Sequence, residues 1–313
     1  MPSEGAVGSV SATRPRLDRK GLFSFLTITF AITYAIEGAL IRGGFRISPG
    51  TLSLGQYVIA AVMWVPALAT ALTVKFVTRE GFAIANVRFG GWRPYVAVGL
   101  IVPGCFLVIY ALTWMSGLGR PDWSLASFRD LIAASSGAAL PPMPSPVIVL
   151  PLVFLATLVL APIVNSVLGF GEELGWRGYL LPKLLPLGKP RAYALLGLVW
   201  GLWHLPLVLV GFTYPGHPLG GALMLVALTT AFGIYLNELT LRHRSSVLAG
   251  WAHGVFNSQK LGVWALLFPS VNPMLGGFAG ALGIGVWAVL GLWKSSSRTG
   301  RASGRPIERG GCT

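Results

Sequence analysis

The chain contains repeated runs of apolar residues that are each long enough to cross a lipid bilayer. Crossing takes about 20 apolar residues in a helix, and several segments meet that criterion. Only 11% of the residues are charged, against about 25% in a soluble domain. The sequence therefore predicts an all-α polytopic membrane protein, a bundle of about eight transmembrane helices. The predicted spans are residues 22–41, 52–74, 94–116, 147–178, 191–211, 219–238, 246–268 and 273–293.

The rest of the chain predicts no soluble domain. Residues 1–20 and 295–313 are rich in Gly, Ser and Arg, and we expect disordered cytoplasmic tails there. The transmembrane bundle then covers residues 21–294. The longest connection, residues 118–145, ends in the sequence "LPPMPSP", which cannot hold a regular helix. It predicts an external loop with one short interfacial helix.

The net charge of +14 follows from topology and does not indicate a nucleic-acid partner. If the N-terminus is cytoplasmic, most of the 24 Lys and Arg lie in the two tails or in cytoplasmic loops. The exceptions are Arg42, Arg46, Arg120, Arg129 and Lys260. This asymmetry follows the positive-inside rule. We therefore expect a multi-pass protein of a prokaryotic plasma membrane with both termini in the cytoplasm.

The stretch "LGFGEELGWRGYLLPKLL", residues 168–185, places charges inside an apolar run. A charge at the bilayer centre costs about 2.5–3.5 kcal/mol on insertion scales. Glu173 and Arg177 are four residues apart, so on a helix they can pair on one face. Glu172 then points about 100° away and is left without this partner. The alternative is a cytoplasmic loop or helix end with an ordinary surface ion pair.

Two of the four histidines lie in predicted spans beside other polar groups. His204, in "WGLWHLP", lies as many residues after Gly188 as Glu172 lies before it, so the two could face each other across a helical hairpin. His253 and Asn257, in "GWAHGVFNSQK", lie four residues apart on one helical face. The alternatives are a buried histidine bonded to a backbone carbonyl for His204, and a polar seam between helices for the second pair.

Three further polar residues lie in or at the ends of predicted spans. Glu37 is expected to have a partner such as Arg42 or a group on a neighbouring helix. Asn237 and Glu238 are expected at the membrane interface near Arg242.

A carboxylate and histidines around a wet cavity suit hydrolysis. Glu172 could take a proton from water as a general base, with a histidine orienting that water. A histidine and an asparagine amide could donate to an oxyanion. No serine or cysteine is placed as an obvious nucleophile, which favours activated water. The residues leave a second possibility open, in which Glu172, His204 and His253 bind a divalent metal such as Zn²⁺, although the H-E-x-x-H spacing is absent.

Three motifs in chain order carry a resemblance to a known family. "EELGWR" reads as E-E-x-x-x-R, "WGLWH" as aromatic-x-x-x-H, and "HGVFN" as H-x-x-x-N. In this order on successive late helices they resemble the type II CAAX prenyl protease family, also called the CPBP or Abi family of intramembrane metalloproteases. The resemblance covers roughly residues 145–270.

The resemblance implies an intramembrane endopeptidase that hydrolyses a peptide bond of a membrane-associated or prenylated substrate. Alternatives are a non-catalytic Abi-type protein of bacteriocin immunity and, on intramembrane carboxylates alone, a proton-coupled transporter. The family's motif positions imply that Glu172 is the water-activating base, with Glu173 as its neighbour, and that His204 shares the water or metal. They imply that His253 and Asn257 stabilise the oxyanion and that Arg177 is a structural partner. Trp200 occupies the position where the family more often has Phe.

Overall fold

The computed structural model describes residues 17–45, 53–136 and 144–297, and these residues form helices and connections without a β-strand. Most of both predicted tails lies outside this range. The predicted fold class, an all-α membrane protein, is confirmed. The elements in chain order are α1 (Arg19–Arg42), α2 (Leu54–Val62), α3 (Val65–Leu72), η1 (Thr73–Thr78), η2 (Phe82–Ala85), α4 (Arg93–Met115), α5 (Ala126–Ser136), α6 (Pro146–Leu155), η3 (Ala156–Leu160), α7 (Ala161–Glu173), η4 (Leu174–Leu180), α8 (Leu181–Leu184), η5 (Leu185–Leu187), α9 (Lys189–Trp203), α10 (Leu205–Leu209), α11 (Pro218–His243), α12 (Ser246–Leu261), α13 (Val263–Leu267) and α14 (Ala281–Ser296).

The number of long spans differs from the predicted eight. Within the described residues, five helical runs are long and apolar enough to cross a membrane. Two predicted spans are interrupted, because α9 ends before His204 and α12 ends before Gly262. The last predicted span begins late, at Ala281. The runs long enough to cross are Arg19–Arg42, Leu54–Thr78, Arg93–Met115, Pro146–Leu187 and Pro218–His243.

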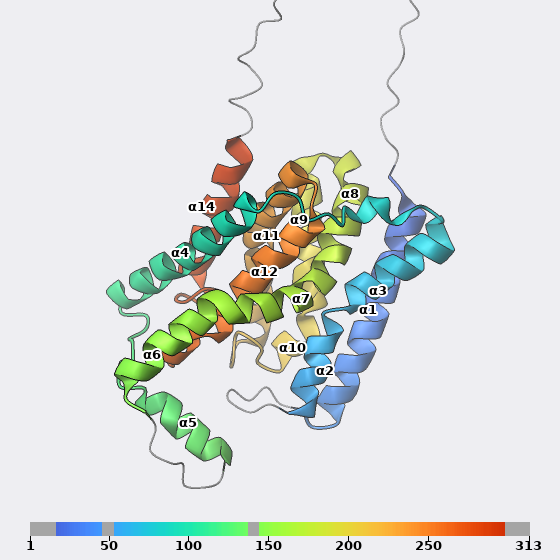
Figure 1. Cartoon of the computed structure of the whole chain (residues 1–313). Helices are drawn as coiled ribbons and strands as arrows, with labels where there is room; N and C mark the ends of the chain where they lie inside the picture. Colours follow the sequence, from blue (N-terminus) through green and yellow to red (C-terminus); the bar gives the residue numbers. More distant parts are fainter. Residues whose placement is uncertain (1–16, 46–52, 137–143, 298–313) are drawn as a thin grey trace, which may run out of the picture.

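The central helices α7, α11 and α12 are flanked by α1–α3 on one side and by α4 and α14 on the other (Figure 1). The start of α1 and the end of α14 lie at the same end of the molecule. The short helix α5 lies at the opposite end, within the connection that was predicted to hold one interfacial helix. This places the polar motifs, which lie on α7–η4, α9 and α12, in the middle of the bundle.

Glycines on one face of the α7–η4 helix allow its other face to point at the bundle interior. A Cβ on Gly171 would lie 2.8 Å from the Trp64 ring, and a Cβ on Gly175 would lie 2.9 Å from the backbone of Pro66. The break between α2 and α3 lies at Met63 and Trp64, and Pro66 is in the first turn of α3. The close approach of α3 therefore leaves the Glu172 side of the helix for α9, α11 and α12.

The packing of α7 against α12 is the most extensive helix contact in the described structure. It depends on glycine at the crossing point. A Cβ on Gly254 would lie 2.5 Å from the Cα of Ser166, closer than real Cβ atoms approach a backbone. Gly169 and Gly250 lie at the same interface, where an added Cβ would lie 3.0 Å and 2.8 Å from backbone atoms of the other helix. Small residues allow membrane helices to pack at this distance.

Replacing Gly254 with alanine is expected to lower the free energy of unfolding by about 1–3 kcal/mol, because overpacking forces backbone shifts of this cost. Gly104→Ala in α4 is the matched control, since a Cβ there meets nothing within 4 Å. Thermal unfolding in detergent should show a lower midpoint for Gly254→Ala and no decrease for Gly104→Ala. Equal midpoints for both variants would contradict this packing.

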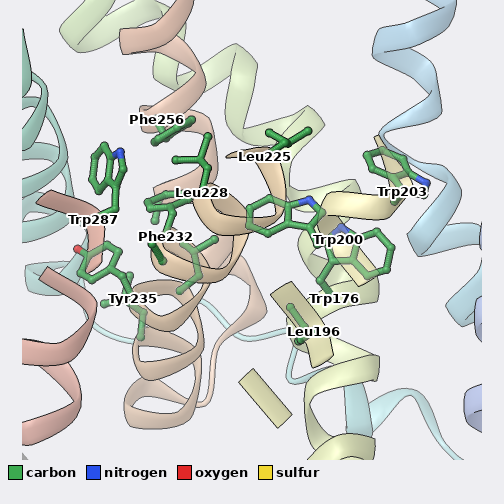
Figure 2. Close-up of a cluster of buried hydrophobic side chains, with 14 of the residues drawn as sticks. Trp176, Leu196, Trp200, Trp203, Leu225, Leu228, Phe232, Tyr235, Phe256 and Trp287 are labelled. Carbon is green, nitrogen blue, oxygen red and sulfur yellow. The ribbon is translucent and has the colours of Figure 1, made fainter. Parts of the chain in front are cut away.

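Aromatic side chains fill the interior beside the polar motifs. Trp176 and Trp203 pack edge to face with ring centres 5.8 Å apart, and Figure 2 shows both near Trp200. A second group, on α11 and α12, brings the ring of Phe232 to 4.4 Å from that of Phe256. Such contacts fix ring positions beyond the effect of burial alone, so the polar residues beside them have rigid surroundings.

An ion network joins the start of α1 to α8. Asp18 caps α1 by accepting a hydrogen bond from the backbone N–H of Gly21 at 2.9 Å. Lys183 Nζ lies 2.7 Å from both Asp18 Oδ2 and Glu80 Oε2. Burial raises the pKa of Asp18, but the hydrogen bonds from Lys183 and Gly21 and the Lys183 charge outweigh it, so the pKa is lower than the ordinary 3.8.

The lowered pKa of Asp18 predicts a pH-dependent contribution to stability. A carboxylate with a depressed folded-state pKa stabilises the fold above its unfolded-state pKa and loses that effect as the pH falls through the folded-state pKa. We expect Asp18→Asn to lower the thermal midpoint at about pH 7 and to match the unmodified protein at about pH 2. A midpoint difference that does not shrink on acidification would contradict the prediction.

Candidate active site

The two carboxylates of "GEEL" have separate partners. Glu173 and Arg177 are fully buried, and the predicted pair is present, with Arg177 Nη1 2.9 Å from Glu173 Oε2. Arg177 also lies over the Trp200 ring, 4.4 Å from its centre. His253 Nδ1 lies 2.9 Å from Glu173 Oε1. Glu173 therefore joins α7 to α12 through His253, and it pairs with Arg177 on the next turn of its own helix.

Asn237 holds Arg177 from the other side. Its Oδ1 accepts a hydrogen bond from Arg177 Nε at 3.1 Å, and its side chain is 1% exposed. Asn237, predicted at the membrane interface near Arg242, is therefore a buried partner of Arg177. The sequence signal was an amide in an apolar helix, but its partner is 60 residues away. Pairing over that separation depends on how α11 packs and cannot be read from helical spacing.

Glu172 is held by two tryptophans. Its Oε2 accepts hydrogen bonds from the indole N–H groups of Trp200 at 2.8 Å and of Trp176 at 3.2 Å. The side chain is 2% exposed. Its Oε1 accepts no hydrogen bond from the described residues. Trp176 is four residues from Glu172 on the same helix, whereas Trp200 reaches the carboxylate from α9.

Trp200 lies between Glu172 and His204. It donates to Glu172 through its indole, and its backbone carbonyl accepts the Nδ1–H of His204 at 2.9 Å. His204 therefore makes the hydrogen bond to a backbone carbonyl that the sequence left open as an alternative to a functional role. Its Nε2 is left to bind another partner. No direct contact between Glu172 and His204 is present in the described structure. On the second helix of the hairpin, Glu172 contacts Trp200, which is one helical turn closer to Gly188 than the predicted partner His204.

The register shift has a physical cause in η4. Residues Leu174–Leu180 are wound as a π-helix, with hydrogen bonds between residues i and i+5. More residues per turn mean less advance per residue than in an α-helix. This winding brings Glu172 closer to the turn than an α-helix would place it, which is the direction of the observed contact with Trp200.

The residues of the second and third motifs line one cavity of about 50 Å³. A water molecule needs about 10–15 Å³ of such volume, so the cavity has room for a few waters. Glu172 itself does not line it, but Trp200 does. Asn257 makes no side-chain hydrogen bond with the described residues. The lining is Trp200, His204, Phe212, Thr213, Leu225, Leu228, Thr229, Phe232, His253, Phe256, Asn257, Lys260 and Phe278.

The donor set does not fit a three-ligand metal site. Catalytic zinc usually takes three protein ligands. In the described residues, no three His, Cys, Asp or Glu side chains lie close enough to share an ion. Glu172, His204 and His253 all lie around Trp200, whose indole binds the carboxylate and whose ring lies near both imidazoles.

The remaining buried carboxylates differ in their partners. Glu238 Oε1 accepts hydrogen bonds from Lys189 and from Tyr193, each at 2.7 Å, and Arg242 Nε is 3.6 Å from Oε2, as expected from its position near Arg242. Glu37 is 1% exposed, and its Oε2 has no hydrogen-bond partner in the described structure. The predicted partner Arg42 does not pair with it there.

The fold and this buried polar site define an integral membrane protein of a helical class with a candidate hydrolytic centre. Residues 148–259 match the model of the family "Type II CAAX prenyl endopeptidase Rce1-like". The resemblance to the type II CAAX prenyl protease family is therefore confirmed over this segment, which contains the three motifs.

A curated relative shows the same likeness. The chain is 32% identical over 82 residues to the CAAX prenyl protease 2 of Methanococcus maripaludis. The aligned part covers 25% of this chain and 30% of the relative. The likeness is therefore local, and the activity of the whole chain is a proposal.

Proposed function

We propose that the protein is an intramembrane endopeptidase of the CAAX prenyl protease type, which hydrolyses a peptide bond of a membrane-associated, prenylated substrate. The observation that carries this proposal is the convergence of the three motifs. Glu172 binds Trp200, Glu173 binds His253, and Trp200 and His253 line the same cavity. All of these residues lie in the segment that matches the family model.

Glu172 acts as the general base on a water molecule. Two indole N–H groups fix Oε2, and Oε1 takes the proton as the water oxygen adds to the substrate carbonyl carbon. The carboxylic acid then returns the proton to the amide nitrogen as the C–N bond breaks. Base and acid catalysis of this kind contribute about 10²–10⁴-fold to a rate.

The histidines and Asn257 surround the attacked carbonyl. His204 donates Nδ1–H to the Trp200 carbonyl, so its Nε2 lone pair can accept a hydrogen bond from the water and orient it. Glu173 accepts a hydrogen bond from His253 Nδ1, which orients the ring, and in the proposed mechanism its Nε2–H donates to the oxyanion. The Asn257 amide supplies a second donor. Oriented donors of this kind stabilise the developing charge.

An apolar groove beside α7 supports a lipid-bearing substrate. It has a volume of about 570 Å³, within the range of small-molecule sites. Its lining includes Trp64, Trp92, Phe170 and Trp251. Phe170 lies in the same turn of α7 as Glu172, and we propose that an isoprenoid chain occupies this groove.

We propose the membrane orientation from charge alone. The excess of Lys and Arg in the loops and tails supports a cytoplasmic location of both termini, and the membrane we propose is the plasma membrane of a prokaryote. The common end of α1 and α14 supports termini on one side.

The test uses purified protein in liposomes and a fluorogenic peptide that carries a farnesylated cysteine. We expect cleavage by the unmodified protein and a rate near background for His204→Gln and His253→Gln, because each loses its role at the water or the oxyanion. His243→Gln is the matched control, since His243 is exposed at the end of α11. If the two cavity variants cleave as fast as His243→Gln, the assignment is wrong.

A further inference from the structure

The cavity that His253 and Asn257 line also contains a threonine hydroxyl that makes no hydrogen bond within the described residues. This hydroxyl is Oγ1 of Thr213, in the connection between α10 and α11, and it is buried. The other hydroxyl of the lining, Thr229 Oγ1, donates to the Gly197 carbonyl at 2.8 Å. Leaving a buried hydroxyl without a partner costs free energy, so the Thr213 hydroxyl is available to a group that enters the cavity.

The backbone at Thr213 is strained. Its φ is +65°, and the Tyr214 N–H donates to the Phe212 carbonyl at 2.7 Å. A hydrogen bond from residue i+2 to residue i around a positive φ defines the rare, strained form of the γ-turn. A β-branched side chain is an outlier in this conformation, which glycine adopts at lower cost. Strain of this kind persists only where the surrounding structure imposes it, and it clusters at active sites.

Both neighbours of Thr213 are fixed in the interior. Phe212 stacks on the His204 ring, with centres 6.1 Å apart and planes 6° from parallel. Tyr214 is fully buried, and its Oη donates to the Ala279 carbonyl at 2.8 Å. The two anchors hold the γ-turn against the cavity, so the Thr213 hydroxyl is presented by a rigid segment of the chain.

The position of this hydroxyl suits a small negatively charged oxygen. The cavity has room for only a few waters, and the oxygen of a tetrahedral intermediate is no larger than a water. His253 and Asn257 reach the cavity from α12, whereas Thr213 reaches it from the α10–α11 connection. A hydroxyl that donates to an anionic oxygen makes a shorter and stronger hydrogen bond than it makes to a neutral one.

We propose that the Thr213 hydroxyl is a third hydrogen-bond donor to the oxyanion that forms when water adds to the peptide carbonyl. This rests on the proposed endopeptidase function and adds a catalytic residue that lies outside the three motifs. The carbonyl electron pair moves onto oxygen as the water oxygen bonds to carbon, and Thr213 donates to that oxygen. The charge leaves the oxygen when the C=O bond re-forms and the C–N bond breaks. The Thr213 proton stays on Oγ1 throughout.

The kinetic test uses Thr213→Val, which removes the hydroxyl and keeps the branched shape. We expect kcat for the farnesylated peptide to fall by about 10- to 100-fold, the range for a hydrogen bond to a charged group. KM should change little, because the bond to the oxyanion forms only in the transition state. Thr213→Ser, which keeps a hydroxyl, should retain most of the rate.

The matched control is Thr73→Val. Thr73 Oγ1 is also buried and without a hydrogen bond in the described structure, but Thr73 lies in η1 and lines neither of the two cavities. This variant should keep the unmodified kcat. Thermal unfolding in detergent should show that Thr213→Val and Thr213→Ser have the same midpoint. If Thr213→Val does not fold, Thr213→Gly replaces it, since glycine accepts the positive φ and also lacks the hydroxyl.

Binding of a transition-state analogue gives a second measurement that does not depend on turnover. The probe is the farnesylated peptide with a phosphinate in place of the amide that is cut, so that it carries a tetrahedral anionic centre. Isothermal titration should show binding to Thr213→Val that is about 10- to 100-fold weaker than to the unmodified protein. Binding to Thr213→Ser should stay close to that of the unmodified protein.

An unmodified kcat in the folded valine or glycine variant would overturn the proposal and leave the peptidase function intact. An equal loss of kcat in Thr213→Ser and Thr213→Val would also overturn it, because the hydroxyl would then not be the group that matters. No cleavage by the unmodified protein would count against the proposed function instead. The phosphinate titration then decides the role of Thr213, and equal binding to the unmodified protein and Thr213→Val would exclude it as an oxyanion donor.

Discussion

Arg177→Met is expected to reduce the free energy of unfolding by about 3–5 kcal/mol, the cost of breaking a buried ion pair by removing one partner. The variant leaves the Glu173 carboxylate with His253 alone and leaves Asn237 Oδ1 without its donor. Neither group is accessible to water, since both side chains are at most 1% exposed. Unfolding in detergent, followed by circular dichroism, measures the loss.

The matched control is Arg191→Met, at an exposed arginine in the first turn of α9. It should change stability little, because exposed charges contribute little. The double variant Arg177→Met with Glu173→Gln should recover part of the loss, since it removes the unpaired charge as well. If Arg177→Met is as stable as Arg191→Met, the buried pair of Glu173 and Arg177 does not stabilise the packing of the α7–η4 helix against α11 and α12.

Glu172→Gln is expected to lower kcat by about 10²–10⁴-fold, because an amide cannot take a proton from water. The fold should remain, since the glutamine carbonyl can still accept the indole N–H groups of Trp176 and Trp200. Steady-state cleavage of the farnesylated peptide in liposomes gives kcat, and thermal unfolding checks the fold.

Trp200→Phe is the graded comparison, because it keeps the aromatic ring and removes one hydrogen bond to Glu172. It should slow cleavage less than Glu172→Gln does. A Glu172→Gln variant that is folded and cleaves at the unmodified rate would mean that another group activates the water.

The parts of the fold that follow from local spacing were predictable. The long apolar runs predicted a helical membrane protein, and the i, i+4 spacing of Glu173 and Arg177 predicted their ion pair. Helical periodicity was sufficient for these because both depend on residues within one helix. The motif order also indicated the family that the segment 148–259 matches.

The parts that depend on the register between helices were not predictable. The π-helical turn of η4 brings Glu172 toward Trp200. No residue in "LGWRGYL" predicts a π-helix in place of an α-helix. The helix ends at His204 and Gly262 shorten two predicted spans. The partner of Arg177 on α11, Asn237, comes from a helix crossing that side-chain spacing does not encode.

The most direct test of the account is the mass of the products that form from one farnesylated peptide in liposomes. The unmodified protein should yield two fragments whose masses together equal the peptide plus one water, while Glu172→Gln should leave the peptide intact over the same period. An intact peptide with the unmodified protein, or the same two fragments at the same rate with Glu172→Gln, would contradict hydrolysis by a water that Glu172 activates.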